Sequence, residues 1–225
     1  MRVYIGYDSR EVAAYEVAKA TAEAQGCEVI PVKEDVLRAA GMLTRQVDRR
    51  GRMYDFVSGA EQATEFAISR FFVPILAQDG WVLFADCDVV FMDDPHKLLH
   101  FSDSSKALMV VKHPSLPGTG DKMDGQAQVP YPRKNWSSVM LINASHPSHK
   151  LLNTTALNCL PGRDLHAFSW LDDSEIGELP ERWNWLVGVR PKPPSPAIAH
   201  FTLGGPWIEG WSKAEHDDIW LEARG

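Results

Sequence analysis

Two aspartates one residue apart, Asp86 and Asp88, are the side chains of this sequence best placed to do chemistry. They follow the apolar run Trp81–Ala85, whose aromatic and β-branched residues are typical of a buried strand. Because charged groups are costly to bury unless paired or ligated, both carboxylates should emerge together at the strand's carboxyl end, where open α/β sheets bind ligands. Such a pair suits Mg²⁺ or Mn²⁺ that also binds phosphate, although a turn or helix cap is the alternative.

A histidine far along the chain, His200, is the expected third ligand of that cation. It follows an apolar segment and precedes the run Gly-Gly-Pro-Trp at 204–207. Two glycines let backbone N–H groups approach an anion closely, and an imidazole beside them could complete a mixed oxygen and nitrogen metal site. Without those glycines, a lone histidine after a strand would be interpreted as structural.

Three further polar positions have both a functional and a structural interpretation. Arg70 lies among apolar residues, so its guanidinium must bind an anion, reach water or pair with an aspartate. The pair Tyr7-Asp8 follows the first expected strand, either at the ligand-binding edge or as a capped turn. The adjacent acids Asp172 and Asp173, judged from the pattern alone, form a solvated helix cap.

The elements that must position these side chains alternate along the chain. Strands are expected at 3–7, 28–32, 81–85, 107–112, 139–143 and 197–200, and helices at 11–25, 64–78 (bent or divided at Pro74) and 147–158. Residues 33–59 are polar without clear periodicity, and 113–134 is a long loop rich in Pro and Gly. This alternation predicts an α/β fold with a mainly parallel central sheet and helices on both faces.

Composition limits the class of protein. A chain of 225 residues, 44% hydrophobic and 24% charged, fits one globular domain that needs neither disulfides nor a structural metal. The net charge of −7 argues against nucleic acid as a partner. No signal peptide precedes the first strand, and no apolar run approaches the roughly 18 residues of a membrane span. We expect a cytoplasmic protein without a transmembrane segment, which leaves peripheral membrane contact open.

In chain order these segments resemble the GT-A glycosyltransferases, and most closely glycosyltransferase family 8 with its bacterial and phage-type relatives. The resemblance rests on Val3–Asp8, Ser69–Pro74, Phe84–Val90, Ser137–Asn143, Leu171–Ile176, Leu179–Asn184 and His200–Thr202 with Gly205–Trp207. It implies the GT-A fold, a Rossmann-like nucleotide-diphospho-sugar transferase fold. It also implies one domain over 1–225, with a nucleotide-binding part at 1–112 and an acceptor and C-terminal part at 113–225.

The activity implied is transfer of a sugar from a nucleotide-diphosphate sugar, with a UDP-sugar favoured, to a glycan or other hydroxyl acceptor, with retention of anomeric configuration. Asp86, Asp88 and His200 would bind Mn²⁺ or Mg²⁺. Asp172 and Asp173 would be catalytic, holding the sugar or stabilising positive character at its anomeric carbon. The nucleotide-sugar would be bound by Gly6, Tyr7, Asp8, Arg70, Asp86, Cys87, Ser137, Ser138 and Gly205.

Four positions depart from the family pattern. Trp136 and Ser138 stand where the family usually has Asn and Gly, so contacts to the donor sugar should differ. Asp173 replaces the usual Gln, and Gly205 replaces a Lys that contacts the diphosphate. Lys213 is a candidate substitute for that lysine.

The 113–134 loop is expected to be mobile without donor and to form part of the acceptor site or a lid. Within it, His113 and Tyr131 are best able to contact a sugar acceptor. The alternative is a connecting loop of no special role.

Three rival functions remain open. A haloacid-dehalogenase-type phosphatase also carries D-x-D after an apolar strand, but its nucleophilic aspartate usually follows the first strand. A sugar-phosphate nucleotidyltransferase would need a Gly-rich, basic N-terminal loop, which is missing from this sequence. A non-catalytic sugar-binding protein with a degenerate GT-A fold would explain the lost lysine, but not the retained aspartates and His200.

Overall fold

Residues 1–114 and 133–225 are described by the structure, a computed structural model. Their main feature is a six-stranded sheet in the order β10-β8-β9-β6-β1-β2. Its strands are β1 (Arg2–Gly6), β2 (Glu28–Val32), β6 (Trp81–Ala85), β8 (Leu108–Val110), β9 (Val139–Asn143) and β10 (Ile176–Glu178). β1 is parallel to β2 and β6, and β8 to β10, whereas β9 runs antiparallel to β6 and β8. The predicted mainly parallel sheet is confirmed.

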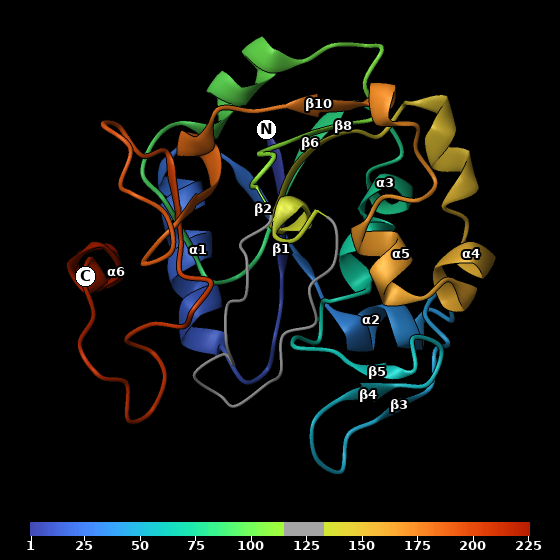
Figure 1. The fold of residues 1–225 in the computed structure, drawn as a ribbon, viewed down its shortest axis with the longest axis horizontal. Coiled ribbons are helices and arrows are strands. Elements are labelled where there is room, and N and C mark those ends of the chain that lie inside the picture. Colours follow the sequence, from blue (N-terminus) through green and yellow to red (C-terminus); the bar gives the residue numbers. More distant parts are fainter. Residues whose placement is uncertain (115–132) are drawn as a thin grey trace.

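Helices cover both faces of this sheet. In Figure 1, α1 (Val12–Ala24) lies to the left of the sheet, and α3 (Val73–Ala77), α4 (Thr154–Cys159) and α5 (Gly162–His166) lie to its right. Helix α1 buries Ala14, Tyr15, Val17, Ala18 and Ala22, and of these Tyr15, Ala18 and Ala22 pack in the main core with the strands of this sheet. Gly26, with a φ of 77°, ends this helical segment as expected and lets the chain return as β2.

A second sheet brings the C-terminal part of the chain to the end of β6. Strand β7 (Val89–Phe91) comes shortly after β6 and pairs antiparallel with β12 (Ile198–His200). Strand β11 (Trp185–Leu186) pairs parallel with β12 on its other side. The register places His200 opposite Val89, so the expected third metal ligand arrives beside the second aspartate.

The helix expected at 64–78 is divided next to Pro74, as one of the two expectations for it had it, but the part before that point is not an α-helix. The structure has a 3-10 helix η1 (Ser69–Phe72) followed by the short helix α3. Pro74 lies in the first turn of α3, where its missing N–H and fixed φ are tolerated, but it cannot continue an α-helix that began earlier.

The helix expected at 147–158 is wrong as a single element. A 3-10 helix η4 (Pro147–Leu151) precedes α4. Asn153 separates them: it is extended, and its side chain accepts a hydrogen bond from the N–H of Ala156. An Asn in this conformation is an N-cap, so Asn153 marks the start of a new helix, α4, although the apolar spacing continues through it.

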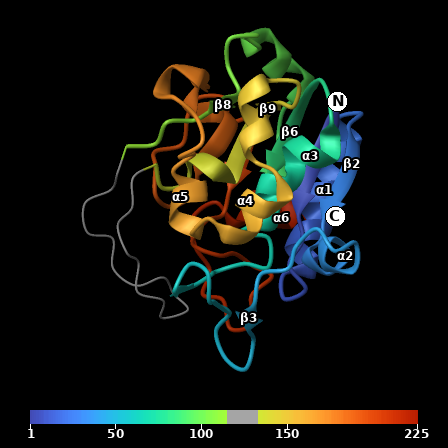
Figure 2. The ribbon, with the colours of Figure 1, turned by 90° about the vertical axis from the view of Figure 1, so that its right-hand side faces the viewer.

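The polar segment after β2 forms structure that its pattern does not predict. It contains α2 (Glu34–Ala39) and a small antiparallel sheet of β3 (Val47–Asp48), β4 (Tyr54–Asp55) and β5 (Ala60–Glu61). A buried ion pair between Arg45 and Asp55 holds this sheet, and Arg45 also donates to the carbonyl of Leu157. In Figure 2 the sheet lies at the lower end of the molecule, below α2.

The remaining elements are short. They are η2 (Pro95–Phe101), η3 (Trp136–Ser138), η5 (Asp173–Glu175), η6 (Glu181–Asn184) and the C-terminal helix α6 (Asp217–Arg224), which packs against α1 and β7. Within the described residues, none of the helices combines the length and the apolar character that crossing a bilayer requires.

Candidate functional site

The end of β6 positions both aspartates. The backbone N–H of Asp86 donates to the carbonyl oxygen of Ser138 (2.9 Å), which extends the pairing of β6 with β9 past the strand. Cys87 is fully buried, with its thiol 3.5 Å from the Glu11 carboxylate. The side chains of Asp86 and Asp88 are 14% and 18% exposed. Both carboxylates therefore reach a surface, whereas Cys87 is buried as a whole residue, and its contact with a nucleotide-sugar stays a prediction.

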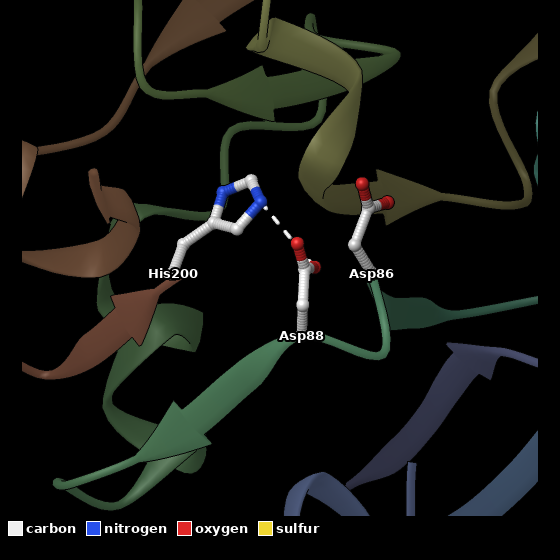
Figure 3. A group of neighbouring side chains, drawn as sticks. All are labelled: Asp86, Asp88 and His200. Carbon is white, nitrogen blue, oxygen red and sulfur yellow. Dashed lines mark ion pairs between the residues drawn. The ribbon is translucent and has the colours of Figure 1, made fainter. Parts of the chain in front are cut away.

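Strand β12 brings His200 next to Asp88. The N–H of Phe201 donates to the carbonyl of Asp88 (2.9 Å), and Nε2 of His200 lies 3.4 Å from Asp88 Oδ1. One ligand atom from each of Asp86, Asp88 and His200 lies within 4.8 Å of the others. Figure 3 shows the imidazole and the two carboxylates gathered where the chain leaves β6 and β12. We call these three side chains the triad.

The donor set of the triad fits a divalent cation. Carboxylate oxygens with one imidazole nitrogen suit Mn²⁺, and the two carboxylates also suit Mg²⁺. Nδ1 of His200 lies 2.9 Å from Oδ1 of Asn184, the kind of outer hydrogen bond that usually orients a metal-binding histidine. The structure thus brings together the three side chains that the sequence predicts as metal ligands.

A fourth acid, Glu11, lies beside the triad and was missed by the sequence interpretation. Burial, together with the charges of Asp88 and Asp8, raises the pKa of Glu11 to about 7. Its signal in the sequence was only its place at the start of the helix that follows β1. When ionised, Glu11 adds to the negative potential around the triad, which favours a cation there.

Arg70 is buried and orients Asp86. Its Nη1 lies 2.7 Å from Oδ1 of Asp86 and donates to the carbonyl of Ser137 (2.9 Å). The guanidinium lies between the rings of Phe66 and Phe84, at 5.1 and 5.3 Å from their centroids. The pairing with an aspartate, which is the structural interpretation of this residue, is present. Its contact with a nucleotide-sugar stays a prediction.

Ser137 and Ser138, the last two residues of η3 before β9, are both buried and hydrogen-bonded. Oγ of Ser137 lies 2.7 Å from Nδ1 of His166, and the hydroxyl of Ser138 donates to the carbonyl of Asn135 (2.7 Å). Burial, with a smaller contribution from the charge of Arg70, lowers the pKa of His166 to about 3. His166 is therefore a neutral hydrogen-bonding partner and not an acid at neutral pH.

At the end of β1, Asp8 is part of the protein's own framework. It is fully buried and accepts hydrogen bonds from the guanidinium of Arg10 (2.6 and 2.9 Å) and from the backbone N–H of Glu65 (3.0 Å). Burial alone would raise the pKa of Asp8, but these hydrogen bonds together hold it below its ordinary value. The capped-turn interpretation describes this residue, and its contact with a nucleotide stays a prediction.

Both glycines predicted to bind the nucleotide-sugar are required by packing. A Cβ on Gly6 would lie 2.5 Å from the ring of Phe66, and one on Gly205 would lie 2.2 Å from the ring of Trp207. Tyr7 is half-buried, with the ammonium of Lys33 4.2 Å from its ring centroid. Of these three positions, only Tyr7 offers a side chain surface to a ligand.

The adjacent acids at the start of η5 are exposed. Asp172 is the N-cap of η5, and its backbone N–H donates to the Glu175 carboxylate (2.9 Å). Asp173 forms an ion pair with Arg133. The solvated cap expected from the pattern is therefore present, while the catalytic role implied by the resemblance stays a prediction.

The loop at 113–134 is described only at its ends, so its predicted mobility and Tyr131 lie outside the described residues. His113 is buried, and burial followed by the charge of His200 lowers its pKa to about 4. Its Nε2 has no hydrogen-bond partner within the described part of the chain. This nitrogen is itself buried, and the contact of His113 with an acceptor stays a prediction.

The sequence is similar to that of a plant protein. It is 39% identical over 229 residues to Protein CDI of Arabidopsis thaliana, a match that covers 98% of this chain and 84% of that protein. No family model matches the sequence.

Two solved glycosyltransferases share the fold. The glycosyltransferase GlyE of Streptococcus pneumoniae TIGR4 matches with a TM-score of 0.60 and 14% identity over 99% of this chain. This chain spans 59% of the length of GlyE. The galactosyltransferase LgtC, in complex with donor and acceptor sugar analogs, matches with a TM-score of 0.54 and 14% identity over all of this chain and 95% of LgtC. These likenesses show the GT-A fold, and the closer resemblance to family 8 stays a prediction.

Proposed function

Because this chain belongs to the family of Protein CDI and has the GT-A fold, we propose that it transfers a sugar from a nucleotide-diphosphate sugar to a hydroxyl acceptor. The observation that carries this proposal is the triad at the carboxyl end of β6, where two carboxylates from one segment meet an imidazole from another. Open α/β sheets bind ligands at this edge, and carboxylates cannot bind a diphosphate directly. A divalent cation bound by the carboxylates can in turn bind the diphosphate.

In this proposal Asp86, Asp88 and His200 hold a divalent cation, either Mn²⁺ or Mg²⁺. When bound, that cation neutralises the diphosphate and the charge that develops on the leaving nucleotide. Arg70 keeps Asp86 in place through the contact at 2.7 Å and has further N–H groups for the donor. The half-buried ring of Tyr7, at the end of the neighbouring strand β1, is the surface proposed for the base.

The finer parts of the proposal are a UDP-sugar as donor, a glycan or other hydroxyl compound as acceptor, and retention of anomeric configuration. LgtC, which shares the fold, has been crystallised with donor and acceptor sugar analogs, which supports a two-substrate reaction. Asp172 and Asp173 are proposed to hold the sugar at its anomeric carbon. The cytoplasmic location likewise stays an expectation.

The test is hydrolysis of a panel of UDP-sugars, with Mn²⁺, with Mg²⁺ and after removal of metal by a chelator. We expect slow release of UDP and a free sugar only with metal, and the anomeric proton in NMR reports retention or inversion. Hydrolysis of a simple phosphate monoester instead would support the phosphatase. Metal-dependent binding of UDP without turnover of any donor would support a non-catalytic binding protein.

A further inference from the structure

The side chain of Asn184 connects His200 of the triad to the start of β9. Asn184 is fully buried, and its Oδ1 lies 2.9 Å from Nδ1 of His200. Its Nδ2 donates to the carbonyl oxygen of Asn135 (3.2 Å) and to Oγ of Ser138 (3.0 Å). A short chain of hydrogen bonds therefore runs from the backbone beside β9 to the imidazole.

The partners of this amide decide which way it faces. The carbonyl oxygen of Asn135 can only accept, so the amide end that faces it has to be the NH₂ group. The hydroxyl of Ser138 gives its own proton to that same carbonyl (2.7 Å), so its oxygen accepts from Asn184. Both contacts require Oδ1 of Asn184 to face His200.

The direction of the amide in turn fixes the proton on the imidazole. Oδ1 of Asn184 can only accept, so Nδ1 of His200 has to carry the hydrogen. In a neutral ring, Nε2 is then left with its lone pair, and this atom faces Oδ1 of Asp88 at 3.4 Å. Two acceptors that face each other repel, and a cation between them removes the repulsion.

We infer that Asn184 is a positioning residue of the metal site: with Ser138 and Asn135 it holds His200 in the Nδ1–H tautomer, so that the Nε2 lone pair is directed at the cation. This inference rests on the proposed metal-dependent function. It also gives a role to Ser138, which stands where the resembling family usually has Gly. A glycine has no hydroxyl that could accept from Nδ2 of Asn184. This hydrogen bond therefore depends on the serine that this chain has in place of the usual glycine.

The first experiment measures the tautomer on the metal-free protein by ¹⁵N NMR of the histidine rings, at a pH where His200 is neutral. We expect the wild type to carry the proton on Nδ1 of His200, and Asn184→Leu, which fills similar space without an acceptor, to lose that preference. Asn184→Asp, which restores an acceptor oxygen, should regain it. An Nε2–H tautomer in the wild type, or an unchanged tautomer in Asn184→Leu, would overturn the inference.

The second experiment measures the affinity for Mn²⁺ alone by electron paramagnetic resonance. Loss of an outer hydrogen-bond partner of a metal ligand weakens binding by about 10- to 100-fold, so we expect a loss in this range for Asn184→Leu. Asn143→Leu is the matched control, since Asn143 is also buried and donates to a backbone carbonyl. Equal Mn²⁺ affinity in Asn184→Leu and in the control would count against the inference.

Two results keep this test separate from that of the proposed function. If the wild type binds no Mn²⁺, the proposed function fails, while the NMR result still decides whether Asn184 fixes the tautomer. If Asn184→Leu does not fold, Ser138→Ala removes one acceptor from the amide and should give a smaller loss of the Nδ1–H preference. An unchanged ring tautomer in folded Ser138→Ala, together with failure of Asn184→Asp to favour Nδ1–H, would overturn the inference.

Discussion

Two neighbouring parallel strands, β1 and β6, each deliver an aspartate to the same edge of the sheet, and the two aspartates have opposite surroundings. Asp8 is fully buried and is neutralised by the guanidinium of Arg10. Asp88 is 18% exposed and lies near His200 and the carboxyl group of Glu11. The carboxylate of Asp8 is paired with a guanidinium, whereas that of Asp88 has an imidazole and another carboxyl group as neighbours.

This difference separates a structural acid from a ligand-binding acid at one sheet edge. A carboxylate gains little from an external cation when both of its oxygens already accept hydrogen bonds from a guanidinium, as those of Asp8 do. Acids that surround one space repel one another, and a bound cation removes that repulsion. In the sequence, Asp88 is a candidate metal ligand, and the resemblance makes Asp8 a candidate contact of the nucleotide-sugar. Their partners, which come from distant segments, distinguish them.

The largest effect is expected for Asp88→Ala. This change removes a ligand of the proposed cation, so metal-dependent UDP binding should be lost, while loss of a charge that repels Glu11 should leave the melting temperature unchanged or higher. Isothermal titration with UDP and Mn²⁺ measures the first, and thermal unfolding the second. Asp218→Asn, an exposed aspartate on α6, is the control. Unchanged Mn²⁺-dependent affinity in folded Asp88→Ala would refute the metal assignment.

Arg70→Lys should have the next largest effect. It keeps the charge but loses the planar fork that holds Asp86 and the Ser137 carbonyl together. Disturbing the orientation of a metal ligand reduces affinity or activity by about 10- to 100-fold, and we expect this for use of the donor, with little change in melting temperature. A large loss of stability with normal donor affinity per folded molecule would make Arg70 a structural residue only.

The sequence predicts the parts of this site that a single segment determines. The apolar runs of β1, β2, β6 and β9 are bounded by polar residues or turn formers, so their positions and the aspartates that follow β6 could be predicted. The pairing of β7 with β12, which brings His200 to Asp88, joins segments far apart in the chain, and the pattern of neither segment predicts it.

What the sequence could not show depends on contacts between distant segments or on very short elements. Nothing in the sequence distinguishes Asn184 from other polar residues, because its role depends on the contacts of its amide with His200 and Ser138. Strands of two residues, such as β4, are too short to show a period of two. Glu11 was taken as the first residue of a helix, and its pKa depends on acids that other strands supply.

Stability should depend on pH through Glu11. The unfolded chain releases this proton near pH 4.5 and the metal-free folded protein near pH 7, so the free energy of unfolding should fall as pH rises between these values and be flat above them. The full loss is about 3 kcal/mol at most. Glu11→Gln should abolish this part of the pH dependence in chemical denaturation. The same slope in wild type and variant would show that Glu11 is not the group responsible.

Asp8→Asn should lower stability rather than ligand affinity. Its oxygens accept hydrogen bonds from Arg10 and from the N–H of Glu65, and an unsatisfied buried donor costs about 1–3 kcal/mol. Denaturation measures this loss, and UDP titration of the folded fraction should be near normal. A variant as stable as the wild type with weaker UDP binding would instead support the nucleotide contact predicted from the sequence.

The smallest effect on stability is expected for Asp173→Asn. Its ion pair with Arg133 is exposed on the aspartate side, and exposed pairs contribute less than about 1 kcal/mol, so the free energy of unfolding should stay within that limit. Such a variant is stable enough for its turnover to be interpreted directly. A clear fall in turnover of the donor would support the catalytic role that the resemblance implies for Asp173. Asp173 would then be a functional acid, as Asp88 is proposed to be. Normal turnover would show that Asp173, like Asp8, has a structural role and no catalytic one.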